Sequence, residues 1–303
     1  MELRHLRYFV AVAEELHFRR AAERLHMSQP PLSQQIRALE QEVGARLLER
    51  SSRRVELTSA GEAFYGRARE ILEAVDDAQR LARRVERGEV GRLSVGFVGS
   101  AMYSVVPELL SAFRERSAGV DLQLRELTTT AQLRALERGQ IDIGFIRPAG
   151  ERDGIAVETV LREPVVVAVP DGHPLAARQR VRLEQLAGEP LVLLTRSGAP
   201  GLRESLARAI AGFGGEAGIV QEAEEMQTVV GLVAAGVGVS LVPESVRALV
   251  RRGVTYRALE DGDVVVELAV AWRRDDRTPV LAAFLELIRG LGGVAPTPAG
   301  GER

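Results

Sequence analysis

The chain has 303 residues, of which 46% are hydrophobic and 27% charged, and its 40 basic residues, all of them Arg, nearly balance 42 acidic ones. The absence of cysteine excludes disulfides, thiolate metal sites and cysteine nucleophiles. No apolar run has the length of a membrane span or of a signal-peptide core. We therefore expect a cytoplasmic protein of two or three domains, with no membrane partner and no indiscriminate coating of nucleic acid.

Apolar residues at helical spacing predict a first helix over residues 3–16, which caps the core beneath the next segment. Residues 18–40 then read as two short helices joined by a tight turn. Pro30 and Pro31 fit only in the first turn of a helix, and Ser28 is the expected N-cap of the second helix. The inner stripes of the two helices are predicted to be Ala21, Ala22, Leu25, Leu32, Ile36 and Leu39.

The outward face of the second helix carries polar side chains that can exchange hydrogen bonds with base edges and phosphates. This is the anatomy of a helix-turn-helix whose second helix reads DNA. An ordinary amphipathic helix pair with a solvated polar face is the alternative. The residues of this face are Ser28, Gln29, Ser33, Gln34 and Arg37.

The segment LLERSSRRVEL predicts two short strands around a polar turn, which beside a helix-turn-helix would form a wing. Arg53 and Arg54 at the tip could reach phosphates or a minor groove, and Arg46 and Arg50 extend the basic cluster. A merely solvated turn is the alternative.

A long helix follows, capped by Thr58 or Ser59, with a capping box from Glu62 to Ser59, and ended by Gly88. Its apolar residues alternate four and three apart, which is the spacing of a coiled-coil seam. We expect this seam to pair with a second chain; the alternative is a helix that lies along its own domain. The seam residues are Phe64, Ala68, Ile71, Val75, Ala78, Ala82 and Val85.

From Arg92 onward strands and helices alternate in the order of a βαβαβ parallel sheet, and a second α/β series begins at PLVLL. Chain crossings near Glu163 and Val265 would join the two series around a cleft, the usual place for a small ligand. The tail GGVAPTPAGGER is predicted to be disordered.

Enzyme chemistry finds no support in the motifs. GFGGEA at residues 212–217 imitates a dinucleotide fingerprint but follows a helix instead of a strand. The four histidines lack metal-ligand spacing, and no GxSxG elbow is present. The competing class is a solute-binding protein, for which we would expect an export signal, or a two-lobed transferase, which would need neither the 18–40 module nor the seam.

The whole chain resembles the LysR-type transcriptional regulators. The resemblance is carried by LRYFVAVAEE, AAERLHMSQPPLSQQIRALEQEVGARLLER and LTSAG near the N-terminus. GQIDIGFIRP, REPVVVAVPDGHPL and LVAAGVGVSLVP resemble members that control aromatic-compound catabolism in response to muconate or chlorocatechol products. The implied fold is a winged helix-turn-helix (1–58), a linker helix (59–88) and a periplasmic-binding-protein-like α/β effector domain (89–303), with subdomain I at 92–162 and 266–293 and subdomain II at 163–265.

For DNA, the resemblance implies that Gln29, Pro30, Ser33 and Gln34 face bases, that Arg53 or Arg54 enters the groove beside them, and that Thr58 contacts phosphate. Gln34 stands where many members carry Arg, so a bidentate contact to guanine is not expected.

For the effector, the resemblance implies that Ser100 and Thr129 bind a carboxylate, helped by backbone donors at the start of a helix near Ser104. Arg147 would supply a countercharge or be an outward-facing loop Arg. The other side of the cleft would be closed by Pro200, Leu202, Gln227 and Thr228. No cofactor is expected beyond the effector, a muconate-like dicarboxylate or an aromatic acid. Ordinary capping and turn residues are the alternative at each of these positions.

The expected assembly is a homotetramer, a dimer of dimers that binds duplex operator DNA, acts on RNA polymerase and serves as an activator. The alternative within this class is a regulator of another pathway whose effector is, for example, a sulfur metabolite or an amino acid.

Overall fold

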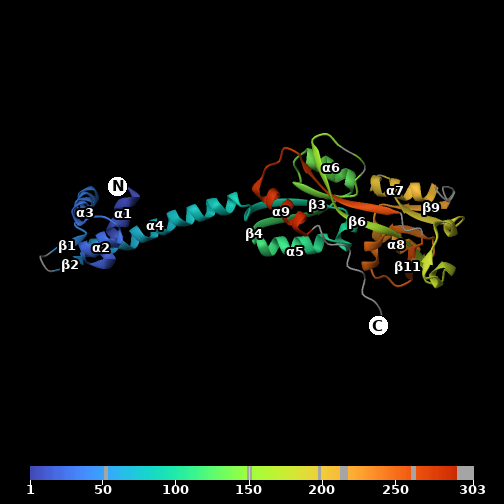
Figure 1. Ribbon diagram of the computed structural model, residues 1–303, viewed down its shortest axis with the longest axis horizontal. Coiled ribbons are helices and arrows are strands. Elements are labelled where there is room, and N and C mark those ends of the chain that lie inside the picture. The colour runs from blue at the N-terminus through green and yellow to red at the C-terminus, as the bar shows by residue number, and fades with distance from the viewer. Residues whose placement is uncertain are drawn as a thin grey trace. The chain divides into compact units, whose positions relative to one another are not determined.

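The structure is a computed structural model that describes residues 1–50, 54–148, 150, 152–196, 199–211, 218–260 and 264–291 (Figure 1). The chain divides into two compact units, Met1–Arg83 and Arg84–Arg303. Each unit is described by itself.

Unit 1 is built from helices that enclose one apolar core and a two-stranded antiparallel hairpin. The helices pack Phe9, Leu32, Ile36 and Leu39 fully out of solvent. Leu16, the expected last residue of the first helix, instead lies just after it with a left-handed φ of 49°. The elements are α1 (Leu3–Glu15), α2 (Phe18–Arg24), α3 (Gln29–Val43), β1 (Leu48–Arg50), β2 (Val55–Leu57) and α4 (Ser59–Glu86).

The helix-turn-helix depends on small and ring-restricted residues, as the sequence predicts. Ala21 and Ala22 are buried between the helices, and prolines occupy the first turn of α3. Ser28 holds the N-cap position, but its side chain makes no capping hydrogen bond, so the predicted cap is wrong in this respect.

Helix α4 starts against the hairpin, and of the two predicted caps, Thr58 and Ser59, it is Thr58 whose side chain caps the helix. Ser59 is the first residue of the helix, so the predicted capping box with Glu62 is wrong. The Thr58 Oγ1 accepts a hydrogen bond from the Gly61 N–H at 2.9 Å and donates to the Arg46 carbonyl at 2.7 Å. A Cβ at Gly61 would lie 2.0 Å from the Leu47 carbonyl oxygen. Only glycine therefore lets α4 pass this close to the hairpin.

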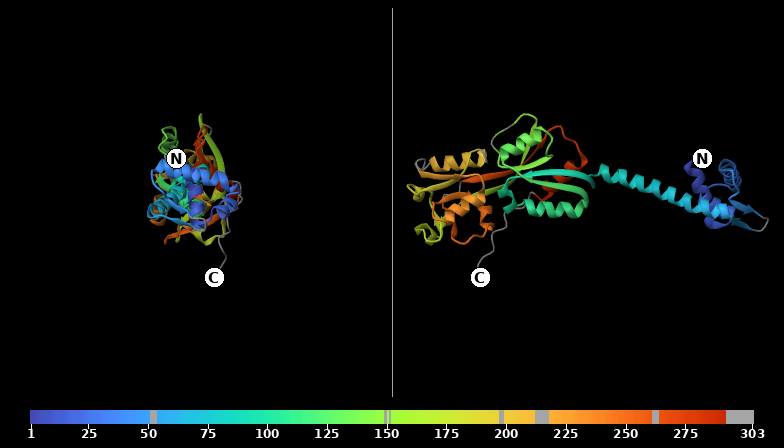
Figure 2. Two further views of the ribbon diagram at one scale, coloured as in Figure 1. Left: turned by 90° about the vertical axis from the view of Figure 1, so that its left-hand side faces the viewer. Right: turned by 180° about the vertical axis from the view of Figure 1, so that it is seen from behind.

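Unit 2 contains two lobes. In the first lobe β3 pairs in parallel with β4 and β5, which confirms the predicted βαβαβ order, and β12 pairs antiparallel to β5. Helices α5 and α9 cover one face of this sheet and α6 covers the other (Figures 1 and 2). The bounds are β3 (Val90–Phe97), η1 (Gly99–Tyr103), α5 (Val106–Arg116), β4 (Gly119–Glu126), α6 (Thr129–Glu137), β5 (Ile143–Ile146), β12 (Val265–Arg273) and α9 (Pro279–Leu291).

The second lobe shares strand β6 (Ile155–Pro170) with the first. Up to Pro164 this strand pairs with β12, and from Val165 it pairs with β10 and β11, close to the crossings predicted at Glu163 and Val265. The sequence pattern did not reveal β6 as one 16-residue strand, nor β11. The other elements are η2 (Pro174–Ala177), β7 (Arg180–Val181), η3 (Leu183–Leu186), β8 (Leu191–Leu194), α7 (Pro200–Ala211), β9 (Ile219–Ala223), α8 (Met226–Ala234), β10 (Ser240–Pro243), η5 (Glu244–Ala248) and β11 (Val254–Leu259).

Some expectations concern residues outside the described part of the chain: the imitation fingerprint at 212–217, Arg53 and the tail from residue 292. Among the described residues, no helix has the length and apolar character needed to cross a membrane. Over the same residues, no group of three or more His, Asp or Glu side chains could hold a metal ion.

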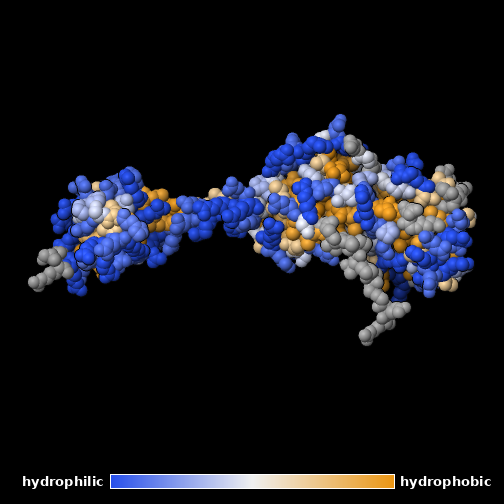
Figure 3. All heavy atoms as spheres, viewed as in Figure 1, coloured by the Kyte–Doolittle hydropathy of each residue, from blue (hydrophilic) through white to orange (hydrophobic). Residues whose placement is uncertain are grey.

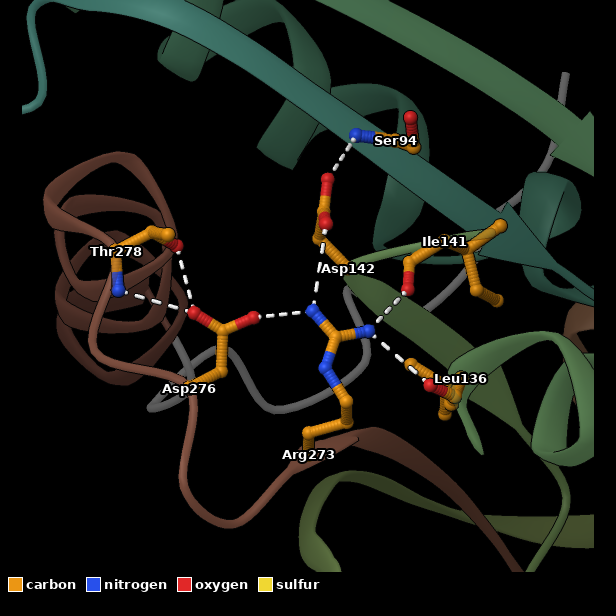
Figure 4. Close-up of polar contacts among 7 residues, drawn as sticks. All are labelled: Ser94, Leu136, Ile141, Asp142, Arg273, Asp276 and Thr278. Carbon is orange, nitrogen blue, oxygen red and sulfur yellow. Dashed lines mark hydrogen bonds and ion pairs between the residues drawn. The ribbon is translucent and has the colours of Figure 1, made fainter. Parts of the chain in front are cut away.

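Arg273 at the end of β12 ties the first lobe together (Figure 4). Its Nη1 donates to the carbonyl oxygens of Leu136 and Ile141 at 3.1 and 3.0 Å, and its Nη2 lies 3.6 Å from Asp142 Oδ1. Asp142 in turn accepts a hydrogen bond from the Ser94 N–H at 2.8 Å. One guanidinium therefore joins β12, the end of α6, the start of β5 and β3.

Asp276 completes this network at the entry to α9. It pairs with Arg273 and accepts two hydrogen bonds from Thr278, from N at 3.0 Å and from Oγ1 at 2.8 Å. Burial acts to raise the pKa of Asp276, but the Thr278 hydrogen bonds and the Arg273 charge outweigh burial and lower it.

We expect Asp276→Asn to lower the free energy of unfolding by about 1–3 kcal/mol at pH 7. Because the folded pKa of Asp276 is lowered, its contribution is complete above the unfolded pKa of about 4 and is lost as the pH falls through the folded value. The difference from wild type in denaturant unfolding should therefore shrink below about pH 4. Asp275→Asn at the exposed neighbouring position is the control, and an equal effect of both variants would contradict the assignment.

Candidate DNA-binding surface and ligand cleft

The start of α3 presents the polar surface that the sequence predicts. Five of the six candidate residues on it are exposed, and Ser33 is half-buried. The opposite side of the helix is held in the core by Leu32, Ile36 and Leu39. Because this inner side is fixed, the orientation of the outer side is fixed as well. The exposed candidates are Ser28, Gln29, Pro30, Gln34 and Arg37.

The hairpin is anchored to α3 by a partly buried ion pair. Arg50 Nη2 lies 2.6 Å from Glu40 Oε2, and its guanidinium sits 5.0 Å from the ring centre of Phe18. Glu40 Oε1 accepts hydrogen bonds from the Leu47 and Leu48 N–H groups at 3.0 and 3.1 Å. Arg50 was predicted to belong to the basic DNA-binding cluster. The contacts with Glu40 and Phe18 instead show that it holds the hairpin against α3 and α2.

The other basic candidates differ in their exposure. Arg54 is 77% exposed and pairs with Glu56 at 3.0 Å. The Thr58 hydroxyl is already engaged in capping α4, as described above. Arg53 belongs to the part of the chain that the structure does not describe.

The predicted seam of α4 divides into two parts. Ala68 is 1% exposed and Phe64 packs edge-on against Phe9 at 5.2 Å, so both belong to the core of unit 1. The prediction that Ala68 lies on an accessible pairing surface is therefore wrong, because the first part of α4 completes the wall of its own domain. Further along, the helix surface is mostly hydrophilic on the face shown in Figure 3.

The later seam positions are accessible. Ile71 and Val85 are 43% and 46% exposed, and Ala78 and Ala82 are also exposed, while Val75 is half-buried. An exposed apolar row on a helix otherwise rich in charge is a surface that a second helix can cover.

A narrow hollow lies between the two lobes of unit 2. The first lobe contributes Ser100, Thr128 and Arg147, and the second contributes Ala199 and Glu225 among others. The open space is about 30 Å³, which is room for about one water molecule. A larger ligand therefore requires the lobes to separate.

Arg147 lies at the floor of this hollow and is 1% exposed, which excludes an outward-facing loop Arg. Its Nη2 donates to Glu163 Oε1 at 2.8 Å, and Glu163 Oε2 accepts from the Ser245 N–H of the second lobe at 2.7 Å. The Nε and Nη1 atoms of Arg147 are buried, and no described residue provides them with a hydrogen-bond partner. Unpaired buried donors are costly, so this position suits an incoming acceptor.

Thr129 was expected to touch the ligand, but its side chain is fully buried and its hydroxyl accepts from the Arg147 N–H at 3.2 Å. Thr128, the N-cap of α6, lines the hollow in its place. Gln132 fixes this turn because its Nε2 donates to the carbonyl oxygens of Leu127 and Phe145 at 2.8 and 3.1 Å. Thr129 and Gln132 thus hold Arg147 and Thr128 in place from behind.

On the second lobe, the expected ligand residues lie beside the hollow instead of along it. Leu202 is buried in the core of the lobe, and Pro200 is half-buried at the start of α7. Gln227 and Thr228 are exposed on the first turn of α8. Sequence reasoning missed Glu225, which precedes them and does line the hollow. Its place between the end of a strand and the start of a helix was the available signal.

Carboxylates surround the mouth of the hollow. Glu224 and Glu225 line it, and a Cβ at Gly99 would lie 2.5 Å from Glu126 Oε1 and 3.1 Å from Glu225 Oε2. Burial, with the charges of Glu126 and Glu224, raises the pKa of Glu225. Burial, with Glu126 and Glu225, also raises the pKa of Tyr103.

Helix geometry adds positive potential at the same place. Helices α6 and α8 follow directly after Thr128 and Glu225, and α7 begins after Ala199. The starts of three helices therefore lie beside one hollow, and the partly positive N-terminal end of a helix favours negative charge. A helix-turn-helix with a wing and a two-lobed ligand cleft together define a ligand-responsive DNA-binding protein.

Comparison with known proteins identifies the family. Residues 3–62 match the bacterial regulatory helix-turn-helix protein, lysR family, and residues 86–292 match the LysR substrate binding domain. The chain therefore belongs to the LysR family of transcriptional regulators, and it is a DNA-binding regulator and not an enzyme.

Similar proteins match nearly the full chain. The HTH-type transcriptional regulator AlsR of Bacillus subtilis (strain 168) is 42% identical over 287 residues, 95% of each chain. The probable cat1 operon transcriptional activator of Acinetobacter lwoffii is 38% identical over 290 residues, also 95% of each. The crystal structure of CbnR, a LysR family transcriptional regulator, has a TM-score of 0.87 at 35% identity and covers 95% of this chain and 100% of its own. Full-length CbnR complexed with its target DNA gives 0.81 at 34% identity, with coverage of 96% and 100%.

We expect Glu40→Ala to destabilise unit 1 by about 2–3 kcal/mol, because it removes the acceptor of two backbone N–H groups and the partner of Arg50. Denaturant unfolding followed by circular dichroism measures this loss. Glu49→Ala, at an exposed position of β1, serves as the control and should change little. Equal stability of Glu40→Ala and wild type would show that the hairpin is held by other contacts.

Proposed function

We propose that this protein is an effector-responsive transcription regulator whose operator-bound oligomer is switched by a small molecule carrying a carboxylate. The observation that carries the ligand part of the proposal is Arg147, a buried residue that lines the cleft and has two nitrogens for which the described residues provide no partner. A carboxylate is the acceptor that a guanidinium recognises best.

On the DNA side, the exposed start of α3 enters a major groove. Gln29, Pro30, Ser33 and Gln34 contact base edges there, while Arg37 contacts the backbone. Arg53 and Arg54 reach the adjacent groove, Thr58 lies near a phosphate, and Arg50 acts by holding the hairpin. The exposed positions in α3 support this assignment, as does the CbnR structure that contains target DNA.

The oligomer forms through α4. The exposed seam from Ile71 to Val85 pairs with the same seam of a second chain, and two such dimers form a tetramer on a pseudo-palindromic site. Such a seam places two α3 helices a fixed number of DNA turns apart.

In the ligand cleft, the carboxylate of the effector contacts Arg147, with Ser100 and Thr128 as further hydrogen-bonding partners. Thr129 acts from behind, and Pro200, Leu202, Gln227 and Thr228 shape the far wall. A dicarboxylate of the muconate type and control of an aromatic-catabolism operon are what the sequence resemblance suggests. Relatives such as the cat1 operon activator support an activating role.

Ligand binding changes the spacing of the lobes, and the repacked effector domains alter how the tetramer bends DNA and meets RNA polymerase. The linkage requires that the ligand bind one arrangement of the lobes more tightly than the other.

The DNA part of the proposal is tested with Gln34→Ala. Loss of one base contact, worth about 1–3 kcal/mol, should weaken binding to a fragment from upstream of the protein's own gene by about ten- to hundredfold. Binding to a scrambled fragment should change much less, since backbone contacts remain. Fluorescence anisotropy measures both affinities. Gln140→Ala, exposed in unit 2, is the control, and an unchanged operator affinity of Gln34→Ala would remove Gln34 from the interface.

The oligomer is tested with Ala78, which is exposed in the single chain so that substitutions leave the fold intact. Ala78→Asp should weaken dimer formation by about tenfold or more, since a cost of ~1.4 kcal/mol suffices, whereas Ala78→Leu should preserve or strengthen it. Sedimentation equilibrium of the full-length protein distinguishes these results. Equal association of the two variants would mean that α4 pairs through a different face.

A further inference from the structure

Arg147 and two carboxylates line the same hollow between the lobes. Arg147 is 1% exposed and paired with Glu163 through Nη2, while its buried Nε and Nη1 have no hydrogen-bond partner among the described residues. Glu224 and Glu225 line the hollow from the second lobe, and Glu126 of the first lobe approaches Glu225 beside Gly99. A ligand that fills the hollow would meet both the Arg147 side, called the floor, and the carboxylate side, called the mouth.

The carboxylates at the mouth lack a cation. Across the described ranges, no Arg side chain lies within ion-pair distance of Glu126, Glu224 or Glu225. Glu126 and Glu225 come from different lobes, yet both place an oxygen beside Gly99, where a side chain would collide with them. Two carboxylates that face one point repel each other unless a cation or a proton lies between them.

The raised pKa of Glu225 is what such crowding produces, since burial and the charges of Glu126 and Glu224 all disfavour its ionised form. An ammonium group fits this place because it carries a positive charge and three hydrogen-bond donors.

We propose that the cleft selects a small amino acid, whose carboxylate binds Arg147 and Ser100 and whose ammonium group lies between Glu225 and Glu126. This inference rests on the proposed function, because it specifies the ligand class of the same cleft.

The same charges argue against a dicarboxylate. One of its carboxylates could bind Arg147, but the second would face three acidic side chains at the mouth. A simple monocarboxylic acid would satisfy Arg147 and leave the repulsion between Glu126 and Glu225 in place. Only a ligand with an anionic and a cationic end satisfies both ends of the hollow.

The test is isothermal titration calorimetry on the full-length protein at pH 7.5. The probes are the common amino acids, each paired with its deaminated acid, for example alanine with propionate, together with succinate and cis,cis-muconate. We expect at least one amino acid to bind, and its deaminated acid to bind about tenfold more weakly or not at all, the scale of one lost charge-assisted contact. Glu225→Gln should reduce amino-acid affinity about tenfold without lowering the melting temperature of the free protein, because it removes a repulsive charge. Glu286→Gln, which removes the same charge from the exposed side of α9, should leave the affinity unchanged.

Three results would overturn the inference. Tighter binding of succinate, cis,cis-muconate or a deaminated acid than of any amino acid would show that the mouth does not select a cation. Equal affinity of Glu225→Gln and wild type for the bound amino acid would remove Glu225 from the site. Binding of no probe would also reject the ligand class. Operator binding, measured in parallel, keeps these results separate from a failure of the proposed regulatory function, which would show as loss of operator recognition by the wild-type protein.

Discussion

The buried carboxylate of Glu163 is the constraint on which unit 2 depends. It lies in β6 just before this strand exchanges its first-lobe partner for second-lobe partners, and it is 2% exposed. One oxygen holds Arg147 of the first lobe and the other holds the Ser245 N–H of the second. A buried charge must keep its partners, so any movement of the lobes has to preserve or replace these bonds. Glu163 therefore links the position of Arg147 in the cleft to the spacing of the two lobes.

The position of Arg147 is fixed by neighbouring residues as well as by Glu163. Its backbone N–H is held by the hydroxyl of Thr129, and the preceding strand end is held by Gln132 through the Phe145 carbonyl. Gly96 and Gly144 leave the space that the Gln132 side chain occupies, since a Cβ at either glycine would lie within 3.0 Å of its Oε1. Thr129 and Gln132 thus position the backbone around Arg147, while the Nε and Nη1 atoms of its guanidinium have no hydrogen-bond partner among the described residues.

The sequence predicts most of the elements because their patterns are local. The stripe of Leu32, Ile36 and Leu39 fixes the face of α3, and the βαβαβ series fixes the order of the first lobe. The 16-residue β6 was not visible, because its two halves meet different partners and share no single alternation. Ala68 and Ala78 carry the same spacing in α4, yet one is buried in its own domain and the other is exposed, a difference that only tertiary packing decides.

The cleft was harder to predict for the same reason. Arg147 was expected either as a countercharge or as a surface loop residue. Its burial just after β5 excludes the surface loop residue. The approach of Glu126 to Glu225 joins residues about a hundred positions apart, each unremarkable in its own segment, and no local spacing reveals it.

The charges in the cleft also bear on how a ligand can act as a switch. Glu163 bonds to both lobes, while the like charges of Glu126 and Glu225 act to push the lobes apart. A molecule that supplied an acceptor to Arg147 and a cation to the two carboxylates would remove this repulsion, so it would bind one lobe spacing more tightly than another. That difference in affinity is the free energy available to shift the population of the lobes, and a ligand indifferent to their spacing would shift nothing.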